Sequence, residues 1–232
     1  MSAEKSGISF ANQVSENETF NITTYEYLYN GGGVAAGDVN NDGLIDLYFT
    51  GNMVPNKLYL NKGQMQFEDI TEKAAVSGRS KWKTGVNMAD VNGDGLLDIY
   101  VCYSGPGTDA ERSNQLFINK GVKNGIPQFE EQAAAYGLDA PGTYSTQCAF
   151  FDMDRDGDLD AFMVNHADMF YNVFYNTKQL RKLRHPQFGN RLYRNDNGRF
   201  TEISEAAGIT GSGINFGLGV AIDDVNGDHW PD

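Results

Sequence analysis

A nine-residue phrase rich in oxygen-bearing side chains occurs four times in this chain. The copies are DVNNDGLID (38–46), DVNGDGLLD (90–98), DMDRDGDLD (152–160) and DVNGDHWPD (224–232). Counted from the first aspartate, Asp or Asn stands at positions 1, 3, 5 and 9 of every copy, and glycine stands at position 6 of three copies. Alternate oxygens on a tightly curled loop converge on one point. The phrase therefore predicts a binding site for a hard cation.

Calcium is the cation that such a loop fits best. Ca²⁺ takes about 6–8 oxygen ligands and tolerates irregular geometry, whereas Mg²⁺ demands a stricter octahedron. Zinc prefers Cys or His ligands, which the alternating positions lack. A backbone carbonyl at position 7 brings the count to about six or seven oxygens, and glycine at position 6 permits the positive φ of a sharp turn. The phrases thus predict up to four calcium sites.

Two other structures share this local composition. An EF-hand begins with the same D-x-N-x-D-G pattern, but it requires a bidentate glutamate at position 12 and flanking helices. Position 12 here is Phe49, Val101 or Met163, each inside an apolar β-type run, so the EF-hand is rejected. An ordinary hairpin turn also favours Asp, Asn and Gly. Four copies in register, with aspartate at both ends, favour the cation site over the plain turn.

The fourth copy departs from the pattern in two ways. His229 replaces the glycine of position 6, although His is among the residues that tolerate positive φ. Its final ligand, Asp232, is also the last residue of the chain. We therefore expect the fourth site to be the weakest.

Two further phrases follow the first three copies and define a repeating unit. The second phrase reads NKLYLNKG, NQLFINKG and NRLYRNDNG, and it starts at Asn56, Asn114 and Asn190. The third reads FEDITEKAAV, FEEQAAAYGL and FTEISEAAGI, and it starts at Phe67, Phe129 and Phe200. The connection between the first and second phrases varies in length, while the rest of the unit keeps its length. Such a pattern indicates a repeated structural module.

The unit reads as four short strands rather than as helices. Its segments are β-branched or aromatic and are separated by Gly, Asn or Asp. Four short strands in a unit of this size are typical of a blade of a β-propeller, which cannot bury its faces alone. The first two strands of a unit are apolar on both faces, as inner strands between neighbouring blades would be. We predict an all-β fold, with an N-terminal segment over 1–32 and a β-propeller of four-stranded blades over 33–232, three complete and a fourth begun.

The net charge excludes some partners. The 232 residues carry a formal charge of −13, which argues against nucleic acid or an anionic membrane surface as the main partner. The predicted ligand sets contain thirteen aspartates, whose mutual repulsion would destabilise the folded state. Four calcium ions would contribute +8 and leave about −5. Since calcium binds only the native loops, we expect it to stabilise the fold.

Calcium affinity and sequence both bear on location. Extracellular modules bind calcium at about 10⁻⁴–10⁻³ M, so such sites stay largely empty in a cytosol. We therefore expect the protein outside the cytoplasm, in the extracellular space or the cell envelope. The sequence has no apolar run long enough for a transmembrane helix, and MSAEKSGISF has no apolar signal-peptide core. We expect a signal or lipoprotein segment to have been removed.

The chain closely resembles the FG-GAP/VCBS repeat family, which includes the propeller of integrin α-subunits. The resemblance rests on GVAAGDVNNDGLIDLYFTGN, NKLYLNKG and FEDITEKA, which are similar to bacterial repeat proteins that often carry a C-terminal ASPIC/UnbV module. NFGLGVAIDDVNGD (215–228) also retains the Phe216-Gly217 pair, which the other copies lack. The resemblance extends from about Gly7 to the last residue. It implies a propeller of about seven blades, of which this chain would be the N-terminal part.

The resemblance also implies a calcium ligand set in the hairpin between the first two strands of each blade. Position 7 contributes its backbone carbonyl and the other positions contribute side chains. The implied ligands are Asp38, Asn40, Asp42, Leu44 and Asp46; Asp90, Asn92, Asp94, Leu96 and Asp98; Asp152, Asp154, Asp156, Asp158 and Asp160; and Asp224, Asn226, Asp228, Trp230 and Asp232.

The variable connection predicts where a partner binds. Connections alternate between the two faces of an up-and-down blade, so this connection lies opposite the calcium hairpin, where a binding surface for protein or glycan would sit. Its longest copy, within 161–189, has spacings of three and four that suggest a short amphipathic helix. The segment carries Phe170, Tyr171, Phe174, Tyr175, Lys178, Arg181, Lys182 and Arg184. It either packs on its own blade with its charges in solvent or contacts a protein or acidic glycan.

No catalytic constellation is visible in the sequence. His166, His185 and His229 lack metal or triad spacing, and Cys102 and Cys148 occupy slots that other units fill mainly with Val or Thr. We expect both cysteines to be buried small hydrophobic residues. Two functions remain. One is a non-catalytic, calcium-binding adhesion or binding scaffold; the alternative is the propeller portion of a larger polysaccharide-active enzyme whose catalytic residues lie outside this chain.

Overall fold

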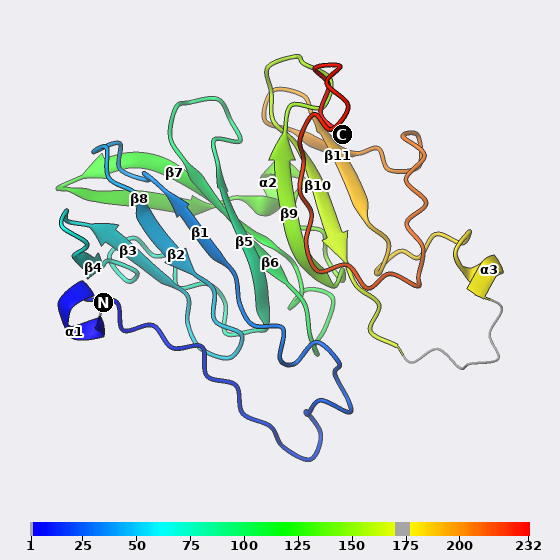
Figure 1. The fold of residues 1–232 in the computed structure, drawn as a ribbon, viewed down its shortest axis with the longest axis horizontal. Coiled ribbons are helices and arrows are strands. Elements are labelled where there is room, and N and C mark those ends of the chain that lie inside the picture. The colour runs from blue at the N-terminus through cyan, green and yellow to red at the C-terminus, as the bar shows by residue number, and fades with distance from the viewer. Residues whose placement is uncertain (1, 170–176) are drawn as a thin grey trace.

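The structure is a computed structural model that describes residues 2–169 and 177–232, and it is built from three antiparallel β-sheets (Figure 1). The first sheet contains β1 (Val34–Gly37), β2 (Asp46–Phe49), β3 (Lys57–Asn61) and β4 (Phe67–Asp69). The second contains β5 (Lys83–Ala89), β6 (Asp98–Tyr103), β7 (Gln115–Lys123) and β8 (Ile126–Glu131). The third contains β9 (Ser145–Phe151), β10 (Asp160–Asn165), β11 (Arg191–Asn195) and β12 (Phe200–Glu202). Three short helices, α1 (Ala3–Ser6), α2 (Ala133–Tyr136) and α3 (Thr177–Leu180), complete the described elements.

Each sheet is a meander in which strands pair in sequence order. The orders are β1-β2-β3-β4, β5-β6-β7-β8 and β9-β10-β11-β12, and every pairing is antiparallel. This confirms the predicted all-β class and the four strands per unit. Because antiparallel strands reverse direction at each connection, the nine-residue loops lie at one end of the sheets and the variable connections at the other (Figure 1).

The first strands of the three sheets lie side by side. The backbone N–H of Gly33 donates to the carbonyl of Thr84 (2.9 Å), and the Thr84 hydroxyl donates to the carbonyl of Ser145 (2.6 Å). Gly85 sits at the closest approach, where a Cβ atom would clash with the Thr146 carbonyl oxygen. The absence of a side chain at this position lets β5 and β9 meet backbone to backbone.

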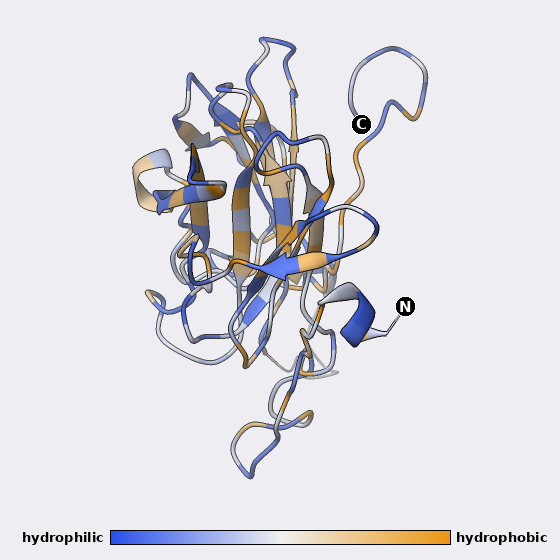
Figure 2. Cartoon of the chain, turned by 90° about the vertical axis from the view of Figure 1, so that its left-hand side faces the viewer, coloured by the Kyte–Doolittle hydropathy of each residue, from blue (hydrophilic) through white to orange (hydrophobic). Residues whose placement is uncertain are grey.

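The core fills the spaces between neighbouring sheets. All six residues of β6 are buried, because the second sheet is covered on both faces. Hydrophobic segments recur along the strands between hydrophilic ones, while the loops are mostly hydrophilic or intermediate (Figure 2). Cys102 and Cys148 are buried and free, as predicted for small core residues. The prediction of two buried faces is wrong for β1, where Val34 is 60 % exposed, because no sheet formed by the described residues lies against the outer face of the first sheet.

Residues 8–30, which we call the N-terminal strap, run across the end of the sheets opposite the nine-residue loops (Figure 1). The backbone N–H of Ser9 donates to the Tyr59 hydroxyl of the first sheet. Further along, the Tyr25 hydroxyl contacts Ser104 Oγ beyond the second sheet (3.1 Å), and Tyr27 stacks on His166 beyond the third (3.7 Å between centroids). The strap therefore joins the three sheets.

The connection between β10 and β11 contains the basic and aromatic segment. Its described part includes α3, a helix of only four residues. The predicted aromatic positions Phe170, Tyr171, Phe174 and Tyr175 lie outside the described residues. Across residues 2–169 and 177–232, no helix has the length and apolar character needed to cross a bilayer.

The fourth unit begins with an extended segment. Phe216 pairs with His166 through an isolated β-bridge. At Gly217 a Cβ atom would clash with the Val164 side chain, which explains why glycine follows phenylalanine there. Among the described residues, β12 is the last strand, so the segment lies along the third sheet without pairing into a fourth.

Candidate metal centre

All four nine-residue loops adopt one hydrogen-bonded conformation. Three contacts recur, each from a backbone N–H to a carboxylate: position 2 to position 9, position 6 to position 1, and position 7 to position 5. Their lengths lie between 2.7 and 3.2 Å in every loop. The fourth loop forms these contacts without a hairpin around it, so the nine residues themselves determine the conformation.

Two positions of each loop have positive φ. At position 6, φ is 84° for Gly43, 83° for Gly95, 96° for Gly157 and 68° for His229. His229 thus adopts positive φ at this position, a conformation that histidine tolerates. Position 4 also has positive φ, with 56° for Asn41, 72° for Gly93, 64° for Arg155 and 78° for Gly227. The sequence analysis did not identify position 4, although three of its four residues are Asn or Gly, the types that favour this conformation.

The aspartate at position 9 connects each loop to the sheet. Asp46, Asp98 and Asp160 are buried at the start of β2, β6 and β10. One carboxylate oxygen accepts the N–H of position 2, and the other accepts the N–H of an asparagine in the third strand at 2.8 Å. Each carboxylate oxygen has a further lone pair for a cation. Asp232, in the fourth loop, is exposed and lacks the strand contact among described residues.

Burial makes the charged form of these position-9 carboxylates costly. Burial, together with a smaller effect of the nearby Asp42 and Asp38, raises the pKa of Asp46 to about 6, against the lowering effect of its two backbone hydrogen bonds. The pKa of Asp98 rises to about 6 for the same reasons, with Asp94 and Asp90 as the charged neighbours. Within each loop, the mutual repulsion of the carboxylates at positions 1, 5 and 9 favours the binding of a divalent cation among them.

The third loop has the strongest metal-binding geometry. One carboxylate oxygen from each of Asp152, Asp154 and Asp156 lies within 4.8 Å of the others, which among the described residues is the one group of three that meets this distance. Asp152 Oδ1 is buried and has no hydrogen-bond donor among the described residues. A buried acceptor without a donor is the kind of atom that a cation satisfies. The Asp158 carboxylate instead accepts the Asn197 N–H (2.8 Å). The backbone carbonyl of Asp158 is therefore the atom that would bind the cation, as expected of position 7.

The first two loops bring positions 3 and 5 together differently. The amide nitrogen of Asn40 donates to the Asp42 carboxylate (3.0 Å), and Asn92 donates to Asp94 in the same way. The amide oxygen of each asparagine accepts the backbone N–H of position 5. In each loop the amide oxygen of position 3 and the carboxylate of position 5 therefore lie on the inside of the turn. Rotation of the amide would direct its oxygen, in place of its nitrogen, toward the position-5 carboxylate and a shared cation.

The fourth loop packs on the third. The guanidinium of Arg155 lies 4.1 Å from the centroid of the Trp230 ring, and His229 Nδ1 lies 3.8 Å from an oxygen of Asp224. Val225 is 82 % exposed, whereas its counterparts Val39 and Val91 are buried. The loop thus has the backbone conformation of the others but less of their support.

A second asparagine in each unit supports the loops, and the sequence analysis did not assign it a role. Asn61, Asn119 and Asn195 each donate their amide to the carbonyl of position 8 in their own sheet's loop. Asn119 also donates to the Val39 carbonyl (2.8 Å), and Asn195 to the Val91 carbonyl (3.2 Å). Each thereby joins its sheet to the loop of the preceding one. The recurring N-x-L-x-x-N phrase was the available signal.

A buried polar cluster lies at the opposite end of the sheets. His166 is 0 % exposed. Its Nε2 lies 2.6 Å from Ser104 Oγ and 3.3 Å from the Tyr25 hydroxyl, while Nδ1 lies 2.9 Å from the Ala167 carbonyl. The stacked ring of Tyr27 covers the imidazole. This serine–histidine contact was not predicted, and it lies buried where the strap meets the connections of the second and third sheets.

Comparison with known proteins supports the presence of sequence repeats in this chain. Residues 38–101, which include the first two loops, match the family model of the FG-GAP-like repeat. The match confirms the resemblance to FG-GAP repeats.

Three curated relatives share part of this chain. Cartilage acidic protein 1 of Xenopus tropicalis is 33 % identical over 141 residues, and the proteins of that name from Mus musculus and Homo sapiens are 29 % and 28 % identical over 138 and 142 residues. The alignments cover 59–60 % of this chain but 20 % of each relative. The chain thus matches about a fifth of the length of these proteins.

Proposed function

We propose that this chain, which carries FG-GAP repeats, is part of a calcium-stabilised β-propeller that acts outside the cytoplasm as a non-catalytic scaffold for binding protein or glycan. The three meander sheets are its blades, with β1, β5 and β9 nearest the propeller axis. The exposed outer face of the first sheet is where a further blade of a closed ring, about seven in all, would pack.

The calcium assignment rests mainly on Asp152 Oδ1, a buried oxygen without a hydrogen-bond donor among the described residues. It lies in a loop whose conformation is shared by all four copies. Three carboxylates within 4.8 Å repel one another, and the buried Oδ1 of Asp152 has no donor among the described residues. A bound cation would neutralise the repulsion and satisfy this oxygen. The same positions in the other loops supply matching oxygens.

The type of donor favours calcium over other ions. The side-chain donors at positions 1, 3, 5 and 9 are carboxylate or amide oxygens. Such hard ligands suit Ca²⁺ or Mg²⁺ rather than Zn²⁺. A loop that offers about six or seven oxygens from flexible side chains suits the larger ion, since Mg²⁺ retains water and demands octahedral geometry.

The ligand-binding part of the proposal rests on the topology. The variable connections and the N-terminal strap lie away from the calcium loops. The connections differ in length between units, while the loops keep theirs. Variable segments on a rigid scaffold commonly carry binding function. The relatives are named cartilage acidic protein, which is compatible with an acidic binding protein outside the cell.

Thermal unfolding with calcium, magnesium or chelator tests the proposal. If sites of about 10⁻⁴ M affinity are filled at 10 mM calcium, each contributes about 2.7 kcal/mol, so the melting temperature should rise by at least about 5 °C over that in EDTA. Magnesium should give a smaller rise. An identical melting temperature in calcium and EDTA would refute calcium stabilisation.

A further inference from the structure

Three basic residues share one face of the turn that contains α3. The backbone N–H of Arg181 donates to the Thr177 carbonyl (3.0 Å) and that of Lys182 to the Gln179 carbonyl (3.0 Å), so the helical path continues past Leu180. Lys178, Arg181 and Lys182 follow i, i+3, i+4 spacing, which places neighbours about 5–6 Å apart between Cβ atoms. All three are exposed. We call them the basic strip.

The basic strip lacks ion-pair partners in a protein rich in carboxylates. Among residues 2–169 and 177–232, ion pairs involve nine other lysine and arginine residues but none of these three. Residues 170–176, FYNVFYN, contain no acidic residue that could supply a partner. Like charges at this spacing repel each other. An external anion would relieve that repulsion.

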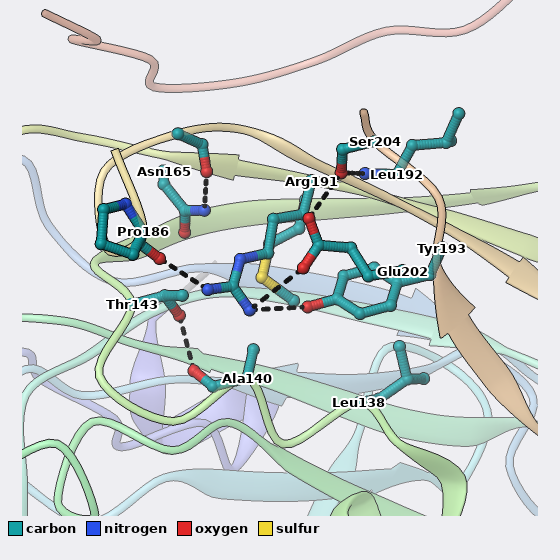
Figure 3. Close-up of polar contacts among 12 residues, drawn as sticks. Leu138, Ala140, Thr143, Asn165, Pro186, Arg191, Leu192, Tyr193, Glu202 and Ser204 are labelled. Carbon is teal, nitrogen blue, oxygen red and sulfur yellow. Dashed lines mark hydrogen bonds and ion pairs between the residues drawn. The ribbon is translucent and has the colours of Figure 1, made fainter. Parts of the chain in front are cut away.

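The chain after the strip is anchored to the third sheet. Arg184 pairs with Glu202 on β12, and the N–H of His185 donates to the Gly211 carbonyl (2.9 Å). The guanidinium of Arg191 donates to the Pro186 carbonyl (2.6 Å) and also contacts Glu202 (Figure 3). Glu202 is therefore already engaged by two arginines. The strip is held at a defined place rather than on a free tail.

We propose that Lys178, Arg181 and Lys182 bind a linear acidic polysaccharide, one that carries sulfate or carboxylate groups along its length. The inference deepens the proposed scaffold function and rests on it. A thin chain can contact the strip alone. A globular acidic protein, a nucleic-acid duplex or an anionic bilayer would bring its charge close to the rest of a protein of net charge −13, within the screening length of about 8 Å.

Binding of defined polymers to the intact chain, in calcium, tests this site. The probes are dextran sulfate and carboxymethyl dextran, which distinguish sulfate from carboxylate, and uncharged dextran of equal length as the blank. The test variant replaces Lys178, Arg181 and Lys182 with glutamine. Its matched control replaces Lys5, Lys123 and Arg199, three other exposed cations without ion pairs among the described residues.

We expect at least one charged dextran to bind, with affinity that falls as salt rises, and uncharged dextran not to bind. The strip variant should lose about tenfold in affinity, the sum of three exposed charge contacts, and the control variant less than twofold. Equal losses in both variants would overturn the site. Binding of poly-glutamate or phosphatidylserine vesicles, without the dextrans, would overturn the polysaccharide assignment.

The failure of this inference is distinguishable from that of the scaffold proposal. The strip variant should keep the calcium-dependent rise in melting temperature, because the strip lies at the other end of the sheets from the calcium loops. A normal calcium response with no binding to either charged dextran overturns the polysaccharide site alone. The loss of the calcium response in the wild-type chain overturns the scaffold proposal.

Discussion

At the scale of single residues, His166 shows how a titratable group can serve the fold. Its imidazole is enclosed by the strap and two sheet connections, where Tyr25 and Ser104 are its hydrogen-bond partners and Tyr27 covers the ring. Burial lowers the pKa of His166 from 6.5 to about 4, although the hydrogen bond with the Ala167 carbonyl raises it slightly. The folded state thus holds this histidine neutral where an unfolded chain would protonate it.

We predict that His166 makes the protein less stable in acid. Between about pH 6.5 and pH 4 the unfolded state binds the proton and the folded state does not, so the free energy of unfolding falls as pH falls through this window. The loss from this group should approach about 3 kcal/mol near pH 4. Urea unfolding from pH 4 to pH 7.5 would measure it.

His166→Gln should flatten the pH dependence of unfolding between pH 4 and 6.5 relative to the wild type. The exposed His229 offers the control, with asparagine as a replacement that tolerates positive φ. If His166→Gln keeps the wild-type slope, buried His166 is not its source.

The sequence predicted much of each loop and little of what surrounds it. Oxygen-bearing residues at positions 1, 3 and 5, followed by aspartate at position 9, form a pattern that is visible without a structure. The position-4 conformation was missed because Arg155 does not indicate positive φ, and the role of Asn119 was missed because its partner, Val39, is 80 residues away. The contact between Ser104 and His166 likewise depends on how two sheets pack.

At the scale of elements, the third strand of each sheet determines how neighbouring sheets meet at the loops. Asn119 lies in β7 and Asn195 in β11, and each links the loop of its own sheet to that of the preceding sheet. Asn61 occupies the same place in β3 but makes only the contact within its own sheet among the described residues. The repeat alignment predicted these strands correctly, because local β patterns repeat with the phrases.

We predict that Asn119→Ala destabilises the protein more than Asn61→Ala. The first change leaves the buried Val39 carbonyl and the partly buried Leu97 carbonyl without their donor and should cost about 1–3 kcal/mol. The second removes the donor of one exposed carbonyl contact, to Ile45, and should cost less than about 1 kcal/mol. Both variants also lose the side-chain oxygen that accepts a glycine N–H in the following turn, so this loss is shared. Chemical unfolding of both variants would compare them, and equal losses would argue against a role for Asn119 between sheets.

At the scale of the whole molecule, the N-terminal strap joins sheets that are far apart in the sequence. Tyr25, Tyr27, Leu28 and Trp82 form a separate apolar cluster where the strap meets the second sheet. The sequence analysis treated residues 1–32 only as a segment leading into the repeats. It could not place the strap, because FNITTYEYLYN has no strand or helix periodicity and its position depends on three connections at once.

We predict that Leu28→Ala destabilises the entire fold. Leu28 is fully buried, and such truncations cost about 2–5 kcal/mol. Ile22→Ala, at an exposed position of the same strap, should change stability by less than about 0.5 kcal/mol. Thermal melts of both variants would measure these changes. If Leu28→Ala were as neutral as Ile22→Ala, the strap would not unfold cooperatively with the three sheets.

The central claim is that the repeated loops hold calcium, and counting the bound ions tests it most directly. Native mass spectrometry of the chain, desalted and then titrated with calcium, should show three ions bound in preference and a fourth at higher calcium. Asp94→Asn, at exposed position 5 of the second loop, should remove one ion, whereas Asp69→Asn, outside the loops, should remove none. A chain that stays metal-free at millimolar calcium would contradict the account.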